Sequence, residues 1–425
     1  MADHALNSDR PARRVVITGM GVVAPNGCDL PSFWDSIVQG ISAGAPVTRF
    51  DTSNFPTKIG CEIKGFDPRQ YMDFKKARRF ELSIQYGIAA SSLAVKDAGI
   101  SFETMDPDRV GVVEGTSLSA TESSLKGQAT LLSRGYTHMS PFALINGHFG
   151  AGSGEIALEL GIKGYAITIS SGSATGNDTI GYALRMIQDD DVDVVLAGGA
   201  EAPFLPALWG IFCLTKVMTT RNDNPRGAMR PLDKTHDGFL LGEGAGFVVL
   251  EELSHALARG ARIYAEVASH GRSCEAYHSV APHPEGLGMH RAMEKALRKA
   301  RLHASEINYI NIHGTATSTY DRVEIRAIKN LFGRYSQRVA VSGTKPITGH
   351  LLAAAGAIET IICALAIKNR EIPFTLNLTD PDEGCDGDLV SGRSRPYPLR
   401  AVMNVSCGFG GKNACLILKE YPDRQ

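Results

Sequence analysis

The sequence predicts an α/β fold made of two halves with a similar pattern of elements. Short apolar or β-branched segments alternate with helical patterns along the chain, which is typical of α/β proteins with largely parallel sheets. The pattern restarts near residues 256–262, so we expect an N-terminal half at 14–258 and a C-terminal half at 259–425. The two halves suggest an internal structural duplication, although no repeat is visible at the residue level. Residues 1–13 are polar and are expected to form a flexible tail.

The composition argues against several classes of protein. The 425 residues are 43% hydrophobic and 21% charged, which are ordinary values for a globular protein. A formal net charge of −1 gives no overall field that would attract nucleic acid. The eight cysteines are scattered without a Cys-x-x-Cys pair, which disfavours a zinc ribbon or a disulfide framework and favours a reducing, cytoplasmic setting. No stretch is expected to approach the length of a membrane span, and residues 1–13 lack the apolar core of a secretory signal.

The chain is organised around a predicted strand, turn and helix at residues 165–188. Residues 165–169 are apolar or β-branched and predict a buried strand, and residues 170–176 are small, as in a tight turn. Ser173 would lie near the N-terminal end of the helix that follows, where unpaired N–H groups favour an anion and a nucleophile can be placed. The alternative is that serine in this turn only caps the helix.

The rest of the first half predicts further alternation of strands and helices. A strand at 14–18 is followed by residues 19–24, a weak match to the dinucleotide fingerprint G-x-G-x-x-A. Because Pro25 would interrupt the helix that binds the pyrophosphate, we predict a tight glycine turn at the edge of a sheet instead. The other predicted elements are a helix within 73–86, strands at 110–113, 192–197 and 247–250, and breaks at 115–117, 189–191 and 242–246.

A basic run opens the predicted helix within residues 73–86. Its cations are Lys75, Lys76, Arg78 and Arg79. Such a run is usually the solvated face of a helix, and the functional alternative is a docking patch for an acidic partner.

Three glycine-rich motifs distinguish the second half. His313 ends a predicted strand at 309–312, and His350 opens a predicted helix at 350–369. A glycine turn at 407–413 links the two final strands. Glycine lets a ligand approach the backbone closely, so two histidines in such surroundings suggest a functional site more strongly than one alone. The other predicted elements are strands at 263–267, 401–405 and 414–419 and a helix at 286–301.

With these motifs the chain closely resembles the β-ketoacyl-acyl carrier protein synthases, the elongating condensing enzymes of the thiolase superfamily. The resemblance covers about residues 14–419 and includes the segments 15–21, 197–201, 220–225, 230–231 with Asp233, 237–239 and 242–246. It implies a thiolase-like five-layered α-β-α-β-α fold of two similar halves, usually dimeric. It implies neither a metal nor a cofactor bound by the enzyme itself, because the substrates are carried on the phosphopantetheine of acyl carrier protein.

The reaction implied by this resemblance is decarboxylative condensation in fatty acid or polyketide biosynthesis. A cysteine at the helix start takes an acyl chain from carrier protein. Malonyl-carrier protein then loses carbon dioxide, and the resulting enolate attacks the acyl thioester and lengthens the chain. Acidic carrier protein would bind the basic run at 75–79, and the expected subunit partner is a second copy or a related ketosynthase subunit. No nucleic acid or membrane partner is expected.

The resemblance also assigns roles to the motif residues. Ser173 occupies the nucleophile position, and His313 and His350 would hydrogen-bond the malonyl thioester oxygen, where negative charge develops. Lys345 would order this site, and the N–H groups of residue 173 and Phe409 would form an oxyanion hole, with Phe409 also acting as a gate. The remaining implied residues are Thr315, Thr317, Gly408 and Gly410 in substrate binding and Asp321, Glu324 and Asn413 in support.

The chain departs from the family at the nucleophile, where it has Ser173 and not cysteine. A helix N-terminus can bring a thiol pKa into the physiological range, whereas a hydroxyl needs an adjacent general base. In this family the two histidines face the carbonyl oxygens more than they act as such a base. Ser173 is therefore expected to accept acyl chains slowly, if at all.

Three explanations of Ser173 remain open from the sequence. In the first explanation, the serine is an introduced substitution that inactivates the enzyme or holds a complex. Alternatively, it is native in a non-elongating subunit, either a malonyl decarboxylase or a chain-length-factor-like partner of an active synthase. Finally, it is a working nucleophile of a serine-dependent acyltransferase or hydrolase. Retention of His313, His350, Lys345 and Phe409 favours an enzyme over an accessory subunit.

Smaller departures concern the surroundings of the site. Cys407 stands where an aromatic residue is common, and we interpret it as a packing residue because nothing places it at a helix N-terminus. Lys412, Ser318 and residues 115–119 also differ from the usual pattern. These changes bear on acyl-chain preference and loop motion, not on the fold.

Overall fold

The protein folds around an eleven-stranded sheet with the strand order β12-β10-β9-β14-β15-β8-β1-β7-β6-β4-β5. The structure is a computed structural model and describes residues 13–422. The strands of this sheet are β1 Val15–Val23, β4 Val110–Gly115, β5 Ala166–Ile169, β6 Val194–Glu201, β7 Gly244–Glu252, β8 Ala265–Cys274, β9 Tyr309–Asn311, β10 Ala340–Ser342, β12 Asp388–Leu389, β14 Ala401–Gly408 and β15 Lys412–Lys419. The short strands β2 Ala45–Pro46 and β3 Ile59–Gly60 pair with each other, as do β11 Glu371–Ile372 and β13 Arg395–Pro396.

Helices cover and separate these strands. The long helices are α1 Leu30–Gln39, α3 Leu82–Ala98, α4 Thr121–Arg134, α6 Ala151–Leu160, α7 Thr175–Gln188, α8 Pro206–Thr215, α10 Leu287–Ala300, α11 Tyr320–Phe332 and α13 Ala355–Asn369. The short ones are α2 Phe74–Ala77, α5 Ala143–Asn146, α9 Leu253–Ala258 and α12 Lys345–Thr348.

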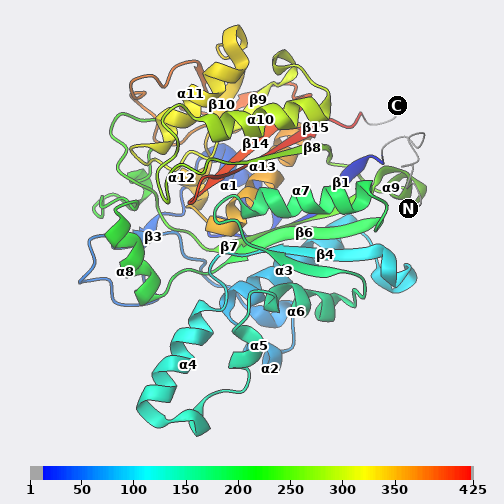
Figure 1. Ribbon diagram of the computed structural model, residues 1–425, viewed down its shortest axis with the longest axis vertical. Coiled ribbons are helices and arrows are strands. Elements are labelled where there is room, and N and C mark those ends of the chain that lie inside the picture. The colour runs from blue at the N-terminus through cyan, green and yellow to red at the C-terminus, as the bar shows by residue number, and fades with distance from the viewer. Residues whose placement is uncertain (1–12, 423–425) are drawn as a thin grey trace, which may run out of the picture.

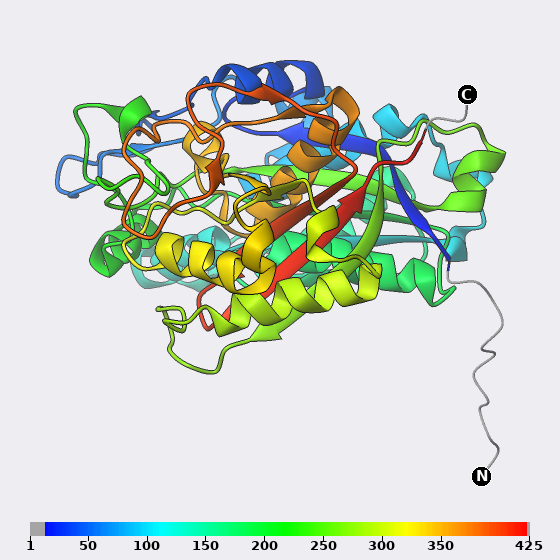
Figure 2. The ribbon, with the colours of Figure 1, turned by 90° about the horizontal axis from the view of Figure 1, so that it is seen from above.

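The elements form five layers (Figure 1). β1 pairs with β8 only at Val16–Glu266 and Ile17–Ala265, so the long sheet divides there into two sheets. α7 and α13 lie between the two sheets and contact both. α3 and α6 cover the outer face of one sheet, and α10 and α11 cover the other, side by side in Figure 2. The α-β-α-β-α arrangement expected from the resemblance is therefore present.

The sheet is mixed, so the expectation of largely parallel strands is wrong in part. β4, β5 and β6 run parallel, as do β9, β10, β12 and β14. β1, β7, β8 and β15 pair antiparallel with their neighbours. The glycine turn predicted between the two final strands is present, and β14 and β15 pair antiparallel through it.

The helix predicted at 286–301 is confirmed as α10. Gly286 and Arg301, which both have positive φ, flank the helix, and its buried residues recur on one face. Those residues are Gly288, Met289, Ala292, Met293, Ala296 and Leu297. This spacing is the reason that the sequence alone identified the helix.

The central helix α13 is buried on every side. The sequence predicted it from His350, but α13 begins at Ala355, after a 3-10 turn at Leu352–Ala354, and His350 lies in the segment before them. The stretch Leu352–Asn369 is 18 residues long and apolar enough to cross a membrane, so the expectation that no stretch reaches that length is wrong. In the fold 89% of it is buried, which is the environment of a core helix between two sheets.

The glycines that follow the first strand do not form a turn. Gly19 and Gly21 lie inside β1, which is an interior strand between β7 and β8, so the predicted glycine turn at a sheet edge is wrong. A Cβ on Gly19 would lie 2.3 Å from the carbonyl oxygen of Ala94, and one on Gly21 would lie 2.0 Å from that of Ala90. The glycines therefore allow α3 to approach the strand closely.

β5 is an edge strand and is only partly buried, contrary to the prediction of a buried strand. Ala166 is exposed, and the other residues of β5 are partly buried. Its pairing partner is β4 on one side, and no other strand within residues 13–422 pairs with its free edge. A continuous apolar strand at an open edge indicates a surface that another chain covers.

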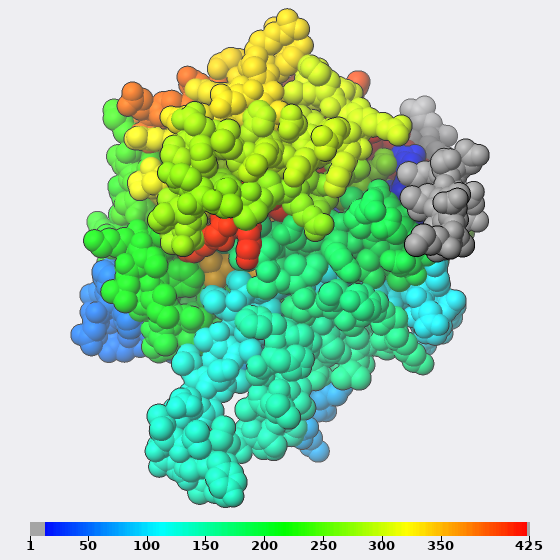
Figure 3. Space-filling model, viewed as in Figure 1, coloured from blue at the N-terminus to red at the C-terminus, as the bar shows by residue number. Residues whose placement is uncertain are grey.

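The segment from α4 to α5 projects from the body of the molecule (Figures 1 and 3). None of the residues of α4 is buried. The segment exposes several large apolar side chains, which are Leu125, Leu131, Leu132, Tyr136, Leu144, Ile145 and Phe149. We call these seven residues the α4–α5 apolar face.

The last features predicted from the sequence are the N-terminal tail and the boundary between the two halves. Residues 1–12 of the tail lie outside the described residues, while Arg13 donates to the Val192 carbonyl at 3.0 Å and pairs with Asp193. α9 and the loop after it occupy the predicted boundary at 256–262 between β7 and β8. We keep the division into 14–258 and 259–425 as a proposal.

Candidate functional site

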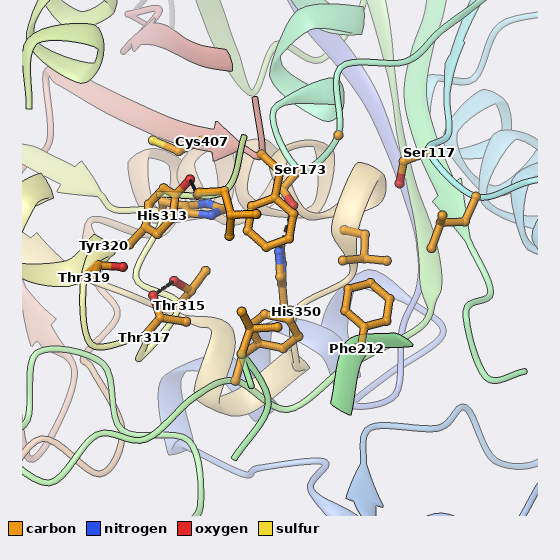
Figure 4. Close-up of a pocket in the computed structure, with 17 residues that line it drawn as sticks. Ser117, Ser173, Phe212, His313, Thr315, Thr317, Thr319, Tyr320, His350 and Cys407 are labelled. Atoms are coloured by element: carbon orange, nitrogen blue, oxygen red, sulfur yellow. Dashed lines mark hydrogen bonds between the residues drawn. The ribbon is translucent and has the colours of Figure 1, made fainter. Parts of the chain in front are cut away.

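A cavity of about 200 Å³ opens where the two halves meet. Residues from widely separated segments line it, and Figure 4 shows Ser173 and His350 at its centre. His313, Thr315, Thr317 and Tyr320 lie toward one side of the cavity, and Ser117 and Phe212 lie toward the other. The sequence identified His313, Thr315 and Thr317 from their motifs and missed Tyr320 and the side with Ser117 and Phe212.

Ser173 lies in the turn between β5 and α7, as the sequence predicted. Gly172 has φ +65°, which favours glycine, and α7 begins at Thr175. The Thr175 hydroxyl accepts the N–H of Ser171 at 2.7 Å and donates to the carbonyl of Gly172 at 2.6 Å, which closes the turn. Ser173 is thereby held just before the helix N-terminus.

The imidazole of His350 contacts the serine directly. Its Nε2 lies 2.9 Å from Ser173 Oγ. The family resemblance implies that the two histidines face carbonyl oxygens, so the hydrogen bond to Ser173 is an additional finding. Burial and then the Lys345 cation lower the pKa of His350 well below its ordinary value, so the ring is neutral at neutral pH and is a weak base.

His313 completes a pair of neutral imidazoles. Its ring centroid lies 5.4 Å from that of His350, with the two rings nearly perpendicular. Burial, followed by the charge of Lys345 and the proximity of His350, lowers the pKa of His313 well below its usual range. Glu324 fixes the strand end by accepting the N–H of His313 at 2.7 Å and that of Gly314 at 3.0 Å.

Lys345 is buried beside His313. Its Nζ donates to the backbone carbonyl of His313, lies 3.5 Å from the imidazole Nδ1 and pairs with Glu359 Oε1 at 2.5 Å. Glu359 was not predicted as a site residue, although it is the one carboxylate within the apolar stretch 352–369. Burial raises the pKa of Glu359 to about 7, and the cation of Lys345 opposes that shift.

Asp321 and the two threonines form the rim beside His313. Asp321 Oδ1 accepts the N–H groups of Thr315 and Ala316, each at 3.1 Å. The hydroxyls of Thr315 and Thr317 lie 3.0 Å apart and line the cavity. The carboxylate therefore shapes the loop, and the hydroxyls are presented to the cavity.

The glycine turn between β14 and β15 lies against the Ser173 turn. A Cβ on Gly408 would lie 2.8 Å from the carbonyl oxygen of Ser171 and 3.1 Å from the backbone nitrogen of Ser173. Phe409 lines the cavity and is 41% exposed, and Gly410 donates its N–H to the Ser279 carbonyl at 2.8 Å.

Two further residues support the glycine turn. Asn413 is buried behind it and donates to the carbonyl of Gly411 at 3.1 Å. Cys407 is buried, lines the cavity and has a thiol pKa that burial raises well above its usual value. The thiol is therefore protonated and unsuited to act as a nucleophile, which agrees with its interpretation as a packing residue.

The basic run does not contribute to this cavity. Lys75, Lys76, Arg78 and Arg79 are exposed on and just after α2. Lys76 pairs with Glu159 at 2.8 Å. The guanidinium of Arg79 lies 4.4 Å from the centroid of the Phe142 ring. No carboxylate within residues 13–422 pairs with Lys75 or Arg78, so their charge is open to a partner.

Among residues 13–422, no three histidine, cysteine, aspartate or glutamate side chains gather in a way that could hold a metal ion. The side chains and backbone groups around the cavity supply hydrogen-bond donors. These are two neutral imidazoles, a buried ammonium group and backbone N–H groups around a serine hydroxyl. Such donors stabilise negative charge on a thioester oxygen.

Two family models match this chain. Residues 12–256 match the model of the beta-ketoacyl synthase N-terminal domain, and residues 264–379 match that of the C-terminal domain. A 3-oxoacyl-[acyl-carrier-protein] synthase 2 of Coxiella burnetii is 42% identical over 411 residues, which are 97% of this chain and 99% of the relative.

Solved structures show the same fold over the full chain. The ishigamide ketosynthase/chain length factor is 34% identical with a TM-score of 0.91, covering 97% of this chain and 100% of its own. A second structure is a type II polyketide synthase acyl-carrier protein in complex with its ketosynthase bound to the hexaketide. It is 29% identical with a TM-score of 0.88, and the match covers 97% of this chain and 100% of that chain. The chain thus belongs to the β-ketoacyl synthase family of acyltransferases, with the thiolase-like fold.

Proposed function

We propose that this chain is a β-ketoacyl-acyl carrier protein synthase of fatty acid or polyketide biosynthesis in which Ser173 impairs the acylation step. The observation that carries the proposal is the placement of His313 and His350 around one cavity that also contains the serine. Thr315 and Thr317 would contact the pantetheine arm, and Phe409 would gate the entrance.

The decarboxylation step does not require the nucleophile. When the carbon–carbon bond of the malonyl group breaks, its electron pair moves onto the thioester carbonyl and carbon dioxide leaves. Nε2–H groups of the neutral His313 and His350 would donate to the enolate oxygen that results. Lys345 would hold His313 in place and keep both imidazoles uncharged.

The acylation step is where serine is unfavourable. The Ser173 hydroxyl must lose its proton as it attacks the acyl thioester, and the base within reach is His350, whose Nε2 lies at 2.9 Å. For this step His350 must be in the tautomer with its proton on Nδ1, whereas decarboxylation uses the tautomer with the proton on Nε2. Proton transfer would create an imidazolium in a buried site that already contains the Lys345 ammonium. The low basicity of His350 therefore makes the serine a slow acceptor.

The test compares this chain with Ser173→Cys and Ser173→Ala. Each protein is mixed with acyl- and malonyl-carrier protein, and adducts and products are followed by intact mass. We expect only the cysteine variant to acylate and elongate, while all three release carbon dioxide from malonyl-carrier protein. Absence of both reactions in the cysteine variant would overturn the proposal.

A second function is favoured by one comparison. The similarity to the ishigamide ketosynthase/chain length factor supports an accessory subunit that shapes a partner's acyl tunnel. A cysteine variant that becomes active only with a related subunit would support that role. An acyl ester that forms on this chain but not on its Ser173→Ala variant would instead support the serine-dependent acyltransferase, for which the 2.9 Å contact is the argument.

The basic run is the proposed docking site for carrier protein. Exchanging Lys75 and Arg78 for glutamate should weaken binding of acyl-carrier protein by about tenfold or more, chiefly at low salt, because these charges steer an acidic partner. Binding is measured by titration at two salt concentrations. The control exchanges Lys58 and Arg298, which are exposed elsewhere, and an equal loss there would contradict the assignment.

The subunit partner is proposed to cover the open edge of β5 and the α4–α5 apolar face. Both are apolar surfaces that the described chain leaves uncovered. The partner is a second copy or a related ketosynthase subunit. A cytoplasmic setting is part of the proposal, and the eight cysteines, all described, are free thiols.

A further inference from the structure

Ser171, two residues before Ser173 in the same turn, is tied to a carboxylate on α7. Its hydroxyl donates to Asp178 Oδ2 at 2.6 Å. Its backbone N–H donates to the hydroxyl of Thr175 at 2.7 Å, so the first turn of the helix holds both groups. These contacts lie outside the lining of the cavity, and the chemistry proposed for the cavity does not use them.

The carboxylate of Asp178 is also contacted from the other sheet. α7 packs against β8 (Figure 1), and His270 on β8 places its Nε2 3.1 Å from Asp178 Oδ1. Among residues 13–422 neither of these two atoms has a hydrogen-bond partner elsewhere. The side chain of Asp178 is 17% exposed and that of His270 is 6% exposed. One carboxylate oxygen therefore holds the turn, and the other faces the imidazole.

The fold leaves a slot for this imidazole. A Cβ on Gly181, three residues after Asp178 on α7, would lie 2.1 Å from Nδ1 of His270. The ring therefore occupies space that glycine leaves open. The backbone carbonyl of His270 accepts a hydrogen bond from Lys299 of α10 at 2.8 Å. The slot and this hydrogen bond fix the direction from which the imidazole approaches the carboxylate.

The position of Ser171 affects the nucleophile position through the glycine turn of residues 407–413. A Cβ on Gly408 would lie 2.8 Å from the carbonyl oxygen of Ser171 and 3.1 Å from the backbone nitrogen of Ser173, so the two turns pack closely. A shift of Ser171 would therefore displace residue 173 relative to the glycine turn.

We propose that Asp178 is a positioning residue that holds the turn of residues 171–173 against the glycine turn through the Ser171 hydroxyl and is itself held by His270. Without this link, Thr175 is left to hold the turn, and residue 173 moves away from the place where the acyl thioester must lie. A displacement of about 1 Å can lower a rate by about 100-fold. The effect on acylation rests on the function proposed above, whereas the effect on the position of residue 173 does not.

The test is made in Ser173→Cys, because a thiol reports its own surroundings. Alkylation by iodoacetamide at pH 7 and acylation by acyl-carrier protein are followed by intact mass. Adding Ser171→Ala, which removes the donor, or Asp178→Ala, which removes the acceptor, should slow alkylation about tenfold, as a rise of one unit in the thiol pKa gives when the thiol leaves the helix N-terminus. Acylation should fall by at least as much. Release of carbon dioxide from malonyl-carrier protein should continue at the parent's rate, because it uses His313 and His350.

The sign of the change separates position from charge. A nearby carboxylate disfavours a thiolate, so loss of the charge of Asp178 alone would make alkylation faster. Asp178→Asn removes the charge but keeps an oxygen that can accept from Ser171. Alkylation in Asp178→Asn should therefore be at least as fast as in the parent, while in Asp178→Ala it is slower.

Two further variants complete the set. Asp189→Ala is the matched control, because Asp189 flanks the other end of α7 with a side chain that is 50% exposed, and alkylation should not change. His270→Phe fills the slot beside Gly181 without a nitrogen and should slow alkylation less than Asp178→Ala does. Circular dichroism shows whether each variant is folded.

The outcomes distinguish this proposal from the proposed function. Unchanged alkylation in folded Ser171→Ala and Asp178→Ala would overturn the positioning role, and so would an equal fall of alkylation and decarboxylation. If Ser173→Cys shows neither acylation nor decarboxylation, but alkylation follows the expected pattern, the proposed function fails and the positioning role stands.

Discussion

At the scale of single residues, the protein contains carboxylates whose protonation differs from that in water. Glu114 points from β4 into the layer of α3 and α6, where Gly152 leaves room for its carboxyl group. Burial raises the pKa of Glu114 to about 8 from its ordinary 4.5. At neutral pH the group is therefore mostly a neutral acid that accepts a hydrogen bond from Thr168 at 3.2 Å.

This environment predicts how stability responds to pH. A folded pKa above the unfolded one means that the contribution of Glu114 is present at acid pH and is lost as the pH rises through about 8. Glu114→Gln should remove part of the fall in the free energy of unfolding between pH 5 and pH 9. Urea unfolding of both proteins across that range measures the difference, and parallel curves would contradict the prediction.

The Lys345–Glu359 pair gives a second prediction at this scale. Glu359→Ala leaves a buried ammonium group without its carboxylate and should cost about 3–5 kcal/mol of stability. The double variant Lys345→Met with Glu359→Leu removes both charges and should lose less. Urea unfolding compares the two, and an equal loss would show that packing and not charge determines the cost.

At the scale of elements, glycines determine how closely helices approach strands. Gly19→Ala should destabilise the fold by about 1–3 kcal/mol or more, because its Cβ would meet the backbone of α3 at 2.3 Å. The control is Gly154→Ala on α6, whose Cβ would have nothing within 4 Å. That change should be neutral or stabilise by up to about 1 kcal/mol through helix propensity, as thermal or urea unfolding would measure. Similar losses in both would contradict this account.

The same glycines mark the limit of prediction from sequence. Periodic burial made α10 and strand propensity made β14 and β15 predictable, because those signals are local. Gly19 and Gly21 suggested a turn, since the sequence does not reveal that α3 crosses the strand at that point. β5 was predicted to be buried because its residues are apolar or β-branched. That composition does not distinguish a strand covered by its own chain from one covered by another chain.

The candidate site shows the same limit, because local motifs can be predicted from the sequence and contacts between segments cannot. His313, His350, Lys345 and Ser173 could be predicted from motifs that are short in sequence, and the structure brings them together. Their roles remain proposals. Glu359, the carboxylate that pairs with Lys345, belongs to another helix, and only packing shows that it is near.

At the scale of the whole molecule, uncovered apolar surface predicts assembly. The protein should behave as a dimer in sedimentation or light scattering, because the α4–α5 apolar face and the edge of β5 lack cover. Leu132→Asp with Leu144→Asp should shift it toward monomer. Leu287→Asp, at an exposed leucine on α10 at the other end of the molecule in Figure 1, is the control. A dimer that resists the double change would place the interface elsewhere.

The short junction between β1 and β8 has a consequence for how the chain could be divided. Only two residue pairs join the two sheets, whereas α7 and α13 pack against both. The halves are therefore held together mainly by their common hydrophobic core and only slightly by hydrogen bonds between strands. A chain cut between α9 and β8 would expose that core on each fragment. Neither fragment should be soluble alone, yet co-expressed fragments should reassemble, which makes this loop a natural place for split-protein complementation.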